Sequence, residues 1–126
     1  MKQFLLIFLS SVALNLSATP LNVEIFTISS LPVNITVSQP VDIHYYTVDT
    51  ASNLLTAFNN AVIQHQNETW FIAHQSQLQQ AFKGLELVEH YGITQLPAIV
   101  FNHDAIIEGN QSLASALSEY VSWQKK

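Results

Sequence analysis

Alternating apolar and polar positions predict two β-strands in the first half of the chain. The first covers Leu21 to Ser29 and carries apolar side chains on both faces near its end, which is typical of a central strand. The second covers Val41 to Thr47. Ser29 to Pro32 breaks the first strand, and Val33 to Pro40 is rich in β-branched residues without a helical period. We therefore expect a connection of about 11 residues with no helix or only a turn, close to the shortest crossover of a parallel pair.

Apolar residues at helical spacing predict helices in the middle of the chain. The first helix begins at the capping pair Asp49-Thr50 and ends near Gln66-Asn67. The next covers Glu68 to Tyr91, and its early part, Trp70 to Ala73, is a candidate for a separate short helix. Gly92 is suited to end this helix in a left-handed conformation. The apolar stripes of the two helices are Leu54, Leu55, Phe58, Ala61 and Val62, and Leu78, Ala81, Phe82, Leu85 and Val88.

The part of the chain after Gly92 predicts a β-hairpin with a proline at its entry. Proline cannot donate to a sheet ladder, so Pro97 suits the first residue of a strand, and an X-Pro bond there can be cis. The two strands are Ala98 to Phe101 and Ala105 to Ile107. Glu108 to Asn110 then opens a last amphipathic helix.

This order of elements, β-β-α-α-β-β-α with Leu-Pro before the third strand, resembles the thioredoxin fold. The resemblance implies an α/β domain with a four-stranded mixed sheet in the order 2-1-3-4, helices on both faces and a missing or reduced first helix. The segment from residue 91 reads Tyr-Gly-Ile-Thr-Gln-Leu-Pro-Ala-Ile-Val-Phe, and Glu-Gly follows at 108–109. It is similar to small thioredoxin-like proteins that integrating conjugative elements encode within mating-pair or type IV secretion gene clusters. The similarity covers most of the chain after residue 18 and is sharpest from Tyr91 to Gly109.

The first 18 residues have the form of a secretory signal peptide, with a charge beside Met1, an apolar run from Phe4 to Leu14 and a small residue at Ala18. The run is shorter than the about 20 residues of a membrane span. An uncleaved anchor or a buried strand is the alternative. We therefore expect a signal peptide at 1–18, a thioredoxin-like domain at 19–126 and export to the periplasm, with no membrane span after cleavage.

Composition excludes two classes of function. The chain contains no cysteine, so the thiol chemistry of thioredoxins is impossible. From Thr19 onward, three lysines stand against nine acidic residues, a net charge of −6, and there is no arginine. Because nucleic-acid binding depends on Lys and Arg to neutralise phosphates, we expect no direct nucleic-acid partner.

The sequence offers little for catalysis or for a metal. No two of the five histidines stand at the i, i+4 spacing of a zinc pair, so we predict no metal site and no cofactor. Ser29 and Ser30 have no base or orienting group that the sequence reveals, so we predict no catalytic residue.

A binding surface is the remaining possibility. In thioredoxin relatives, the residue before the cis proline offers its backbone to an extended peptide, which docks as an added strand. Carried over to this chain, the resemblance implies a protein-binding groove made of Ser29, Ser30, Leu31, Pro32, Gln95, Leu96 and Pro97. The equally weighted alternative is that Leu96-Pro97 only starts a strand, because a fold alone does not give a function.

The resemblance implies a non-enzymatic periplasmic accessory protein of conjugative DNA transfer, whose partner is a protein component of the conjugation or secretion apparatus. One alternative is a periplasmic enzyme that is derived from a thioredoxin-like oxidoreductase and has thiol-independent or metal-dependent activity. Another is a holdase for exported subunits. A homo-oligomer is open as well, because the second strand could pair with a copy of itself at a sheet edge.

Overall fold

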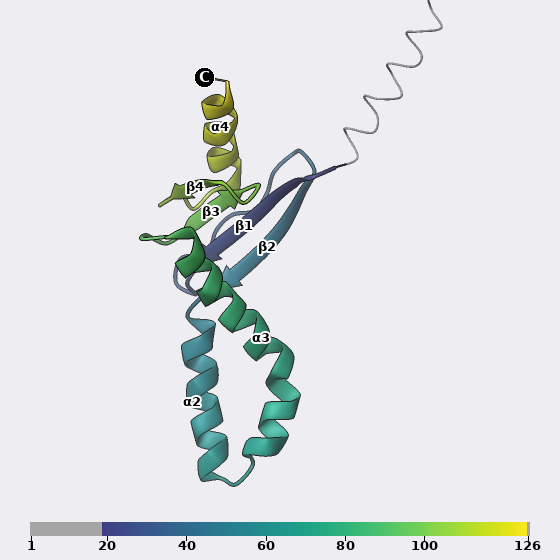
Figure 1. The fold of residues 1–126 in the computed structure, drawn as a ribbon, viewed down its shortest axis with the longest axis vertical. Helices are drawn as coiled ribbons and strands as arrows, with labels where there is room; N and C mark the ends of the chain where they lie inside the picture. The colour runs from purple at the N-terminus through teal and green to yellow at the C-terminus, as the bar shows by residue number, and fades with distance from the viewer. Residues whose placement is uncertain (1–18, 126) are drawn as a thin grey trace, which may run out of the picture.

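The computed structural model describes residues 19–125, which form a four-stranded sheet with helices on both faces (Figure 1). The strands are β1 (Leu21–Thr27), β2 (Val41–Thr47), β3 (Ala98–Phe101) and β4 (Ala105–Glu108), in the order β2-β1-β3-β4. β1 is parallel to β2 and antiparallel to β3, and β3 is antiparallel to β4. The predicted mixed sheet and its thioredoxin-like order are thus confirmed. The predicted signal peptide, 1–18, lies outside the described residues.

One face of the sheet packs against helix α4 (Leu113–Gln124) and against the β1–β2 connection. No helix forms anywhere in this connection, residues 28–40, as expected. Instead Val33 is buried in the core beside α4, and Asn34 forms a parallel bridge with Ser112. The Asn34 amide donates to the Gln111 carbonyl at 2.9 Å, and the Leu113 amide donates to the Asn34 carbonyl at 2.8 Å. An extended segment that is paired with the loop before α4 therefore replaces the first helix of the fold.

The other face of the sheet packs against the C-terminal end of helix α3 (Asn67–Tyr91). Phe26 and Val100 meet Leu87 and Val88 there. Helix α2 (Thr50–Ile63) packs against α3, and the two form an antiparallel hairpin that extends beyond the sheet (Figure 1). We call residues 50–82, which include α2 and the N-terminal part of α3, the arm.

Three expectations about the helices differ from the structure. α2 ends at Ile63, before the expected end near Gln66-Asn67. α3 is one continuous 25-residue helix, so the separate short helix at Trp70 to Ala73 was wrong. Its polar residues face solvent along the arm and do not interrupt it. α4 begins at Leu113 and not at Glu108, because Glu108 still pairs with Ala98 in the sheet. The Ser112 side chain then caps α4 by accepting from the Ser115 amide at 3.2 Å.

Other local expectations are confirmed. Gly92 follows α3 in the left-handed conformation, with a φ of 67°. Asn102 and His103 form the turn between β3 and β4, also with positive φ. Among residues 19–125, no helix has both the length and the apolar character that crossing a membrane requires.

Candidate functional site

The predicted groove residues lie at one end of the sheet. Phe26 pairs with Ala98 in the β1–β3 register, so the loop after Thr27 and the Leu96-Pro97 entry leave the sheet next to each other. The Leu96–Pro97 peptide bond is cis. Leu31 and Leu96 are half-buried and Pro97 is buried, whereas the polar or outermost members of the set are exposed: Ser29, Ser30, Pro32 and Gln95. The structure therefore brings together at one edge two loops that are more than 60 positions apart in the sequence.

Asp49 anchors the first of these loops. Its carboxylate oxygens accept from the Ser29 amide, both at 3.2 Å, and its Oδ1 accepts from the Ser29 hydroxyl at 3.0 Å. The expected side-chain cap of α2 by Asp49 was wrong, because the carboxylate bonds to Ser29 and makes no capping bond. The sequence also showed no acidic partner for Ser29. Since this carboxylate binds the amide as well as the hydroxyl, the contact holds the Ser29 loop against the start of α2.

Glu108 anchors the second loop. Its Oε2 accepts from the Thr94 amide at 2.7 Å and from the Gln95 amide at 3.3 Å, and its Oε1 accepts from the Thr94 hydroxyl at 3.2 Å. The Thr94 amide holds the pKa of Glu108 below its usual value, against an opposing effect of desolvation, and the Gln95 amide and Thr94 hydroxyl add to the lowering. Sequence reasoning missed this role, because Glu108 read as part of a helix start.

Leu96 lies between two tethered residues and has unpaired backbone groups. The Gln95 amide is bound to Glu108, and the Pro97 carbonyl accepts from the Gly109 amide at 2.7 Å. Neither the amide nor the carbonyl of Leu96 has a hydrogen-bond partner in the described part of the chain. An unpaired donor and acceptor on one residue, held in place on both sides, is the feature that an added peptide strand requires.

A polar cluster that the sequence did not reveal lies on the α3 face of the sheet. Glu24 is buried in the central strand β1 and accepts a hydrogen bond from the Tyr91 hydroxyl at the end of α3. His103 Nδ1 lies 3.1 Å from Glu24 Oε1 and 3.1 Å from the Tyr91 hydroxyl. The sequence held one hint, because a lone acidic residue within an apolar central strand needs polar partners, but it did not identify those partners.

Burial and the hydrogen bond to Glu24 strongly raise the pKa of the Tyr91 hydroxyl. A neutral Tyr91 therefore remains a donor to the buried carboxylate at ordinary pH. Since the cluster joins α3 and the β3–β4 turn to the central strand, its role in this fold is to hold these three segments together.

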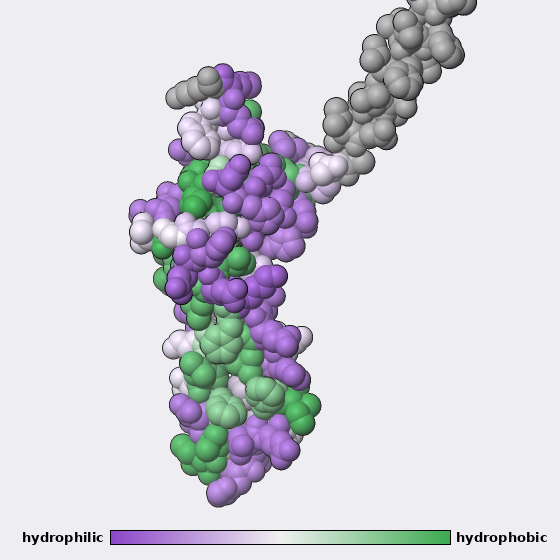
Figure 2. Space-filling view, viewed as in Figure 1, coloured by the Kyte–Doolittle hydropathy of each residue, from purple (hydrophilic) through white to green (hydrophobic). Residues whose placement is uncertain are grey.

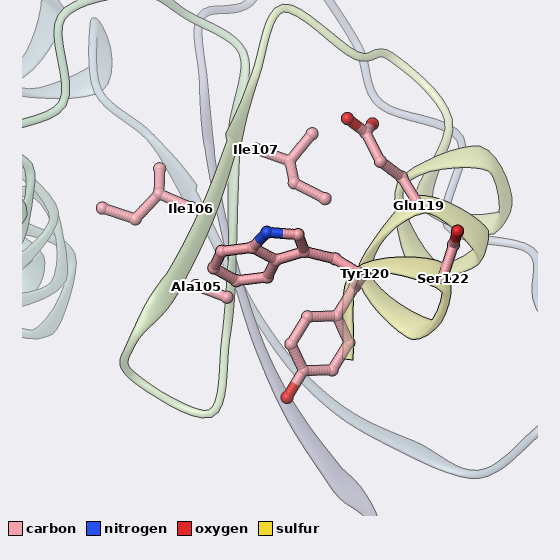
Figure 3. Close-up of a pocket in the computed structure, with 7 residues that line it drawn as sticks. Ala105, Ile106, Ile107, Glu119, Tyr120 and Ser122 are labelled. Atoms are coloured by element: carbon pink, nitrogen blue, oxygen red, sulfur yellow. The ribbon is translucent and has the colours of Figure 1, made fainter. Parts of the chain in front are cut away.

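A separate pocket of about 290 Å³ lies between β4 and α4 (Figure 3). Ile107 points into the space between the strand and the helix, while the Glu119 carboxylate and the Tyr120 hydroxyl point in different directions (Figure 3). Trp123 also lines the pocket and is 62% exposed. No pair of polar groups converges in this pocket, and none of the predicted groove residues lines it. Elsewhere in residues 19–125, no three side chains of the metal-binding types gather into a site.

The chain has no significant match among curated proteins and none among solved structures. Residues 21–126 match a family model described as "Protein of unknown function (DUF1525)". The match runs from the first residue of β1 to the end of the chain. Because it covers far more than half of the sequence, the protein belongs to the DUF1525 family.

Proposed function

We propose that this protein is a non-enzymatic, exported accessory protein of conjugative DNA transfer. It would bind an extended segment of another component of the conjugation or secretion apparatus through the groove loops Ser29–Pro32 and Gln95–Pro97. The unpaired backbone of Leu96 carries the proposal of peptide binding. The resemblance of Tyr91 to Gly109 supports the conjugative role, and the signal-peptide pattern at 1–18 supports the periplasmic location.

The geometry favours a peptide ligand for an energetic reason. Asp49 and Glu108 each tie one loop of the groove to the body of the domain. Loops that are already ordered lose less conformational entropy on binding, so more of the interaction energy appears as affinity. Each backbone hydrogen bond at Leu96 would contribute about 0.5–1.5 kcal/mol net.

The charge distribution narrows the class of partner. Two carboxylates border the groove, and the chain from Thr19 has a net charge of −6. Opposite charges across an interface raise the association rate and exclude partners of like charge. The expected ligand is therefore an extended segment with apolar side chains for Leu31 and Leu96 and with basic residues at its flanks.

The test is crosslinking and pull-down of the tagged protein from the periplasm of a conjugating donor. The groove variant is Leu31→Glu/Leu96→Glu, and the control is Asn60→Glu/Gln80→Glu, which adds the same charge on the arm. Circular dichroism checks that both remain folded. We expect a defined apparatus component to be captured by the wild type and the control and lost from the groove variant, together with a lower frequency of transfer.

Three results would overturn the proposal. An unchanged set of partners in a folded groove variant would place the binding surface elsewhere. Unchanged transfer frequency in a donor that lacks the protein would remove the conjugative role. If no partner is captured and a bound metal survives purification, the enzyme alternative takes its place.

A further inference from the structure

The arm has one apolar and one polar face. Six large apolar residues are exposed on it. Four of them directly follow a residue that lies buried or half-buried between the helices: Leu55, Val62, Phe71 and Phe82 follow Leu54, Ala61, Trp70 and Ala81. The other two, Ile63 and Ile72, each stand one residue further along and lie outside this stripe, 74% and 68% exposed. Polar residues directly precede the same inner positions: Asn53, Asn60, Thr69 and Gln80. One residue along a helix is a rotation of about 100°.

The two helices turn their apolar residues to the same side of the arm. Each of the four stripe residues lies about 100° around its helix from the line along which α2 and α3 touch. Because the two helices are antiparallel, this rotation turns both apolar stripes toward the same side of the arm. Figure 2 shows hydrophobic side chains gathered over both helices of the arm on the visible face. The exposed fractions are 48% for Leu55, 43% for Val62, 46% for Phe71 and 47% for Phe82. We call this surface the arm face.

The arm face is almost free of charge. Glu68 is the only charged residue between Thr50 and Phe82, although the chain from Thr19 carries nine acidic residues and three lysines. A helix that lies on a membrane surface usually carries Lys or Arg on its polar side, and the arm has neither. A strongly charged protein partner would also find no complementary charge here. The arm face is instead the place where two copies of this acidic chain can meet without repulsion.

We propose that two copies of the chain form a homodimer through their arm faces, with the arms antiparallel and the two sheets at opposite ends. An antiparallel pair of helices with one apolar side is half of a four-helix bundle, and a second copy completes it with the same surface. The antiparallel arrangement keeps the acidic sheet ends of the two copies apart. This inference does not depend on the proposed groove.

The size of the arm face indicates a reversible dimer. The 14 residues of α2 span about 21 Å, and two adjacent helices are about 20 Å wide. The arm face of each copy therefore has a projected area of about 400 Å². Standard stable interfaces bury about 800 Å² of accessible surface per partner. We therefore expect monomer and dimer to exchange with concentration.

Sedimentation equilibrium of the chain from Thr19 tests the proposal. The arm-face variant is Val62→Glu/Phe82→Glu, and the control is Asn60→Glu/Gln80→Glu, which flanks the same Ala61 and Ala81 on the polar side. We expect the dimer dissociation constant to rise at least about tenfold in the arm-face variant, because like charges would be buried against each other, and to change little in the control. A wild type that is monomeric at all concentrations, or equal dimerisation of both variants, would overturn the proposal.

A second measurement uses the absence of cysteine from the chain. Gln75 stands near the middle of the apolar stripe of α3, four residues after Phe71, so Gln75→Cys would lie close to its copy at the two-fold axis. We expect a disulfide-linked dimer from Gln75→Cys under oxidation and none from Gln77→Cys, which faces the polar side. Lack of a Gln75→Cys crosslink would overturn the antiparallel arrangement. A monomer that cosediments with phosphatidylcholine vesicles would assign the arm face to lipid and overturn the dimer.

Discussion

The Tyr91 hydroxyl, at the last residue of α3, donates a hydrogen bond to the buried carboxylate of Glu24 in the central strand. The Tyr91 ring also meets the Phe26 ring edge-on, with centroids 6.1 Å apart. These contacts lie at the end of α3 that touches the sheet. Since the arm leaves the sheet from this helix, the Tyr91–Glu24 pair helps to set the direction in which the arm projects.

The first prediction concerns the loss of the Tyr91 hydroxyl. Tyr91→Phe leaves a buried carboxylate without its O–H donor, which should lower the free energy of unfolding by about 1–3 kcal/mol. For a domain of this size each kcal/mol corresponds to a decrease in Tm of about 4–8 °C. Thermal unfolding followed by circular dichroism measures the change. Tyr46→Phe is the control, because the Tyr46 hydroxyl feels the charge of Glu24 but does not donate the hydrogen bond that Tyr91 makes. Equal losses in the two variants would contradict the assignment.

The second prediction concerns alkaline pH. Burial, followed by the hydrogen bond to Glu24, raises the pKa of Tyr91 above its usual value of 10. The neutral hydroxyl is therefore favoured in the folded state, and its stabilisation is complete below about pH 10 and is lost as the pH rises toward the folded-state pKa. Urea unfolding from pH 8 to 11 should show a steeper loss of stability in the wild type than in Tyr91→Phe. Parallel pH profiles would refute this coupling.

The third prediction concerns acid pH at the groove. The pKa of Glu108 is lowered below 4.5, first by the Thr94 amide. A depressed pKa stabilises the folded loop above the usual pKa, and this contribution is lost as the pH falls through the folded-state value. The Thr94 amide chemical shift should therefore titrate below pH 4.5 in an NMR experiment, and Glu108→Gln should abolish that titration. Glu119→Gln on α4 should leave it unchanged, and a Thr94 titration that survives Glu108→Gln would identify another group.

The fourth prediction concerns the contact of α3 with β2. A Cβ added at Gly84 would lie 3.1 Å from Tyr46 Cβ and 3.2 Å from Cδ1, and the Tyr46 ring is buried and stacked on Phe26 with centroids 5.1 Å apart. We expect Gly84→Ala to be destabilising by about 1 kcal/mol net, because the overpacking outweighs the gain in helix propensity. In a Tyr46→Ala background the clash is absent, so Gly84→Ala should become stabilising. Chemical denaturation of the wild type, the two single variants and the double variant measures the effect of Gly84→Ala on the free energy of unfolding in each background. An effect of the same sign in both backgrounds would show that contact with Tyr46 does not cause the destabilisation.

Short-range patterns predicted most of the fold. The alternation in Leu21 to Thr27 located the central strand, the Leu-Pro entry located β3, and Gly92 located the end of α3. Each of these features is decided by backbone geometry within a few residues. Where one side chain could serve two partners, the local pattern failed. Asp49 stands where a helix cap is expected, but it bonds to Ser29, which is 20 positions away.

The polar cluster of the structure was beyond the reach of local patterns. Glu24 and Tyr91 are 67 positions apart, and nothing in the chain between them specifies that they meet. The meeting follows from the order of the strands and from the end of α3 that packs on the sheet.

By itself, the sequence determined that thiol chemistry is impossible, since no cysteine exists, and it determined the type and order of the elements, since these depend on local periodicity and turn residues. Only the tertiary structure decided which apolar stripes are covered. Val88 packs on the sheet whereas Phe82, in the same helical stripe, is 47% exposed. Periodicity along a helix shows that an apolar side exists, but whether anything covers that side depends on contacts between distant segments, and along the arm the sheet is out of reach.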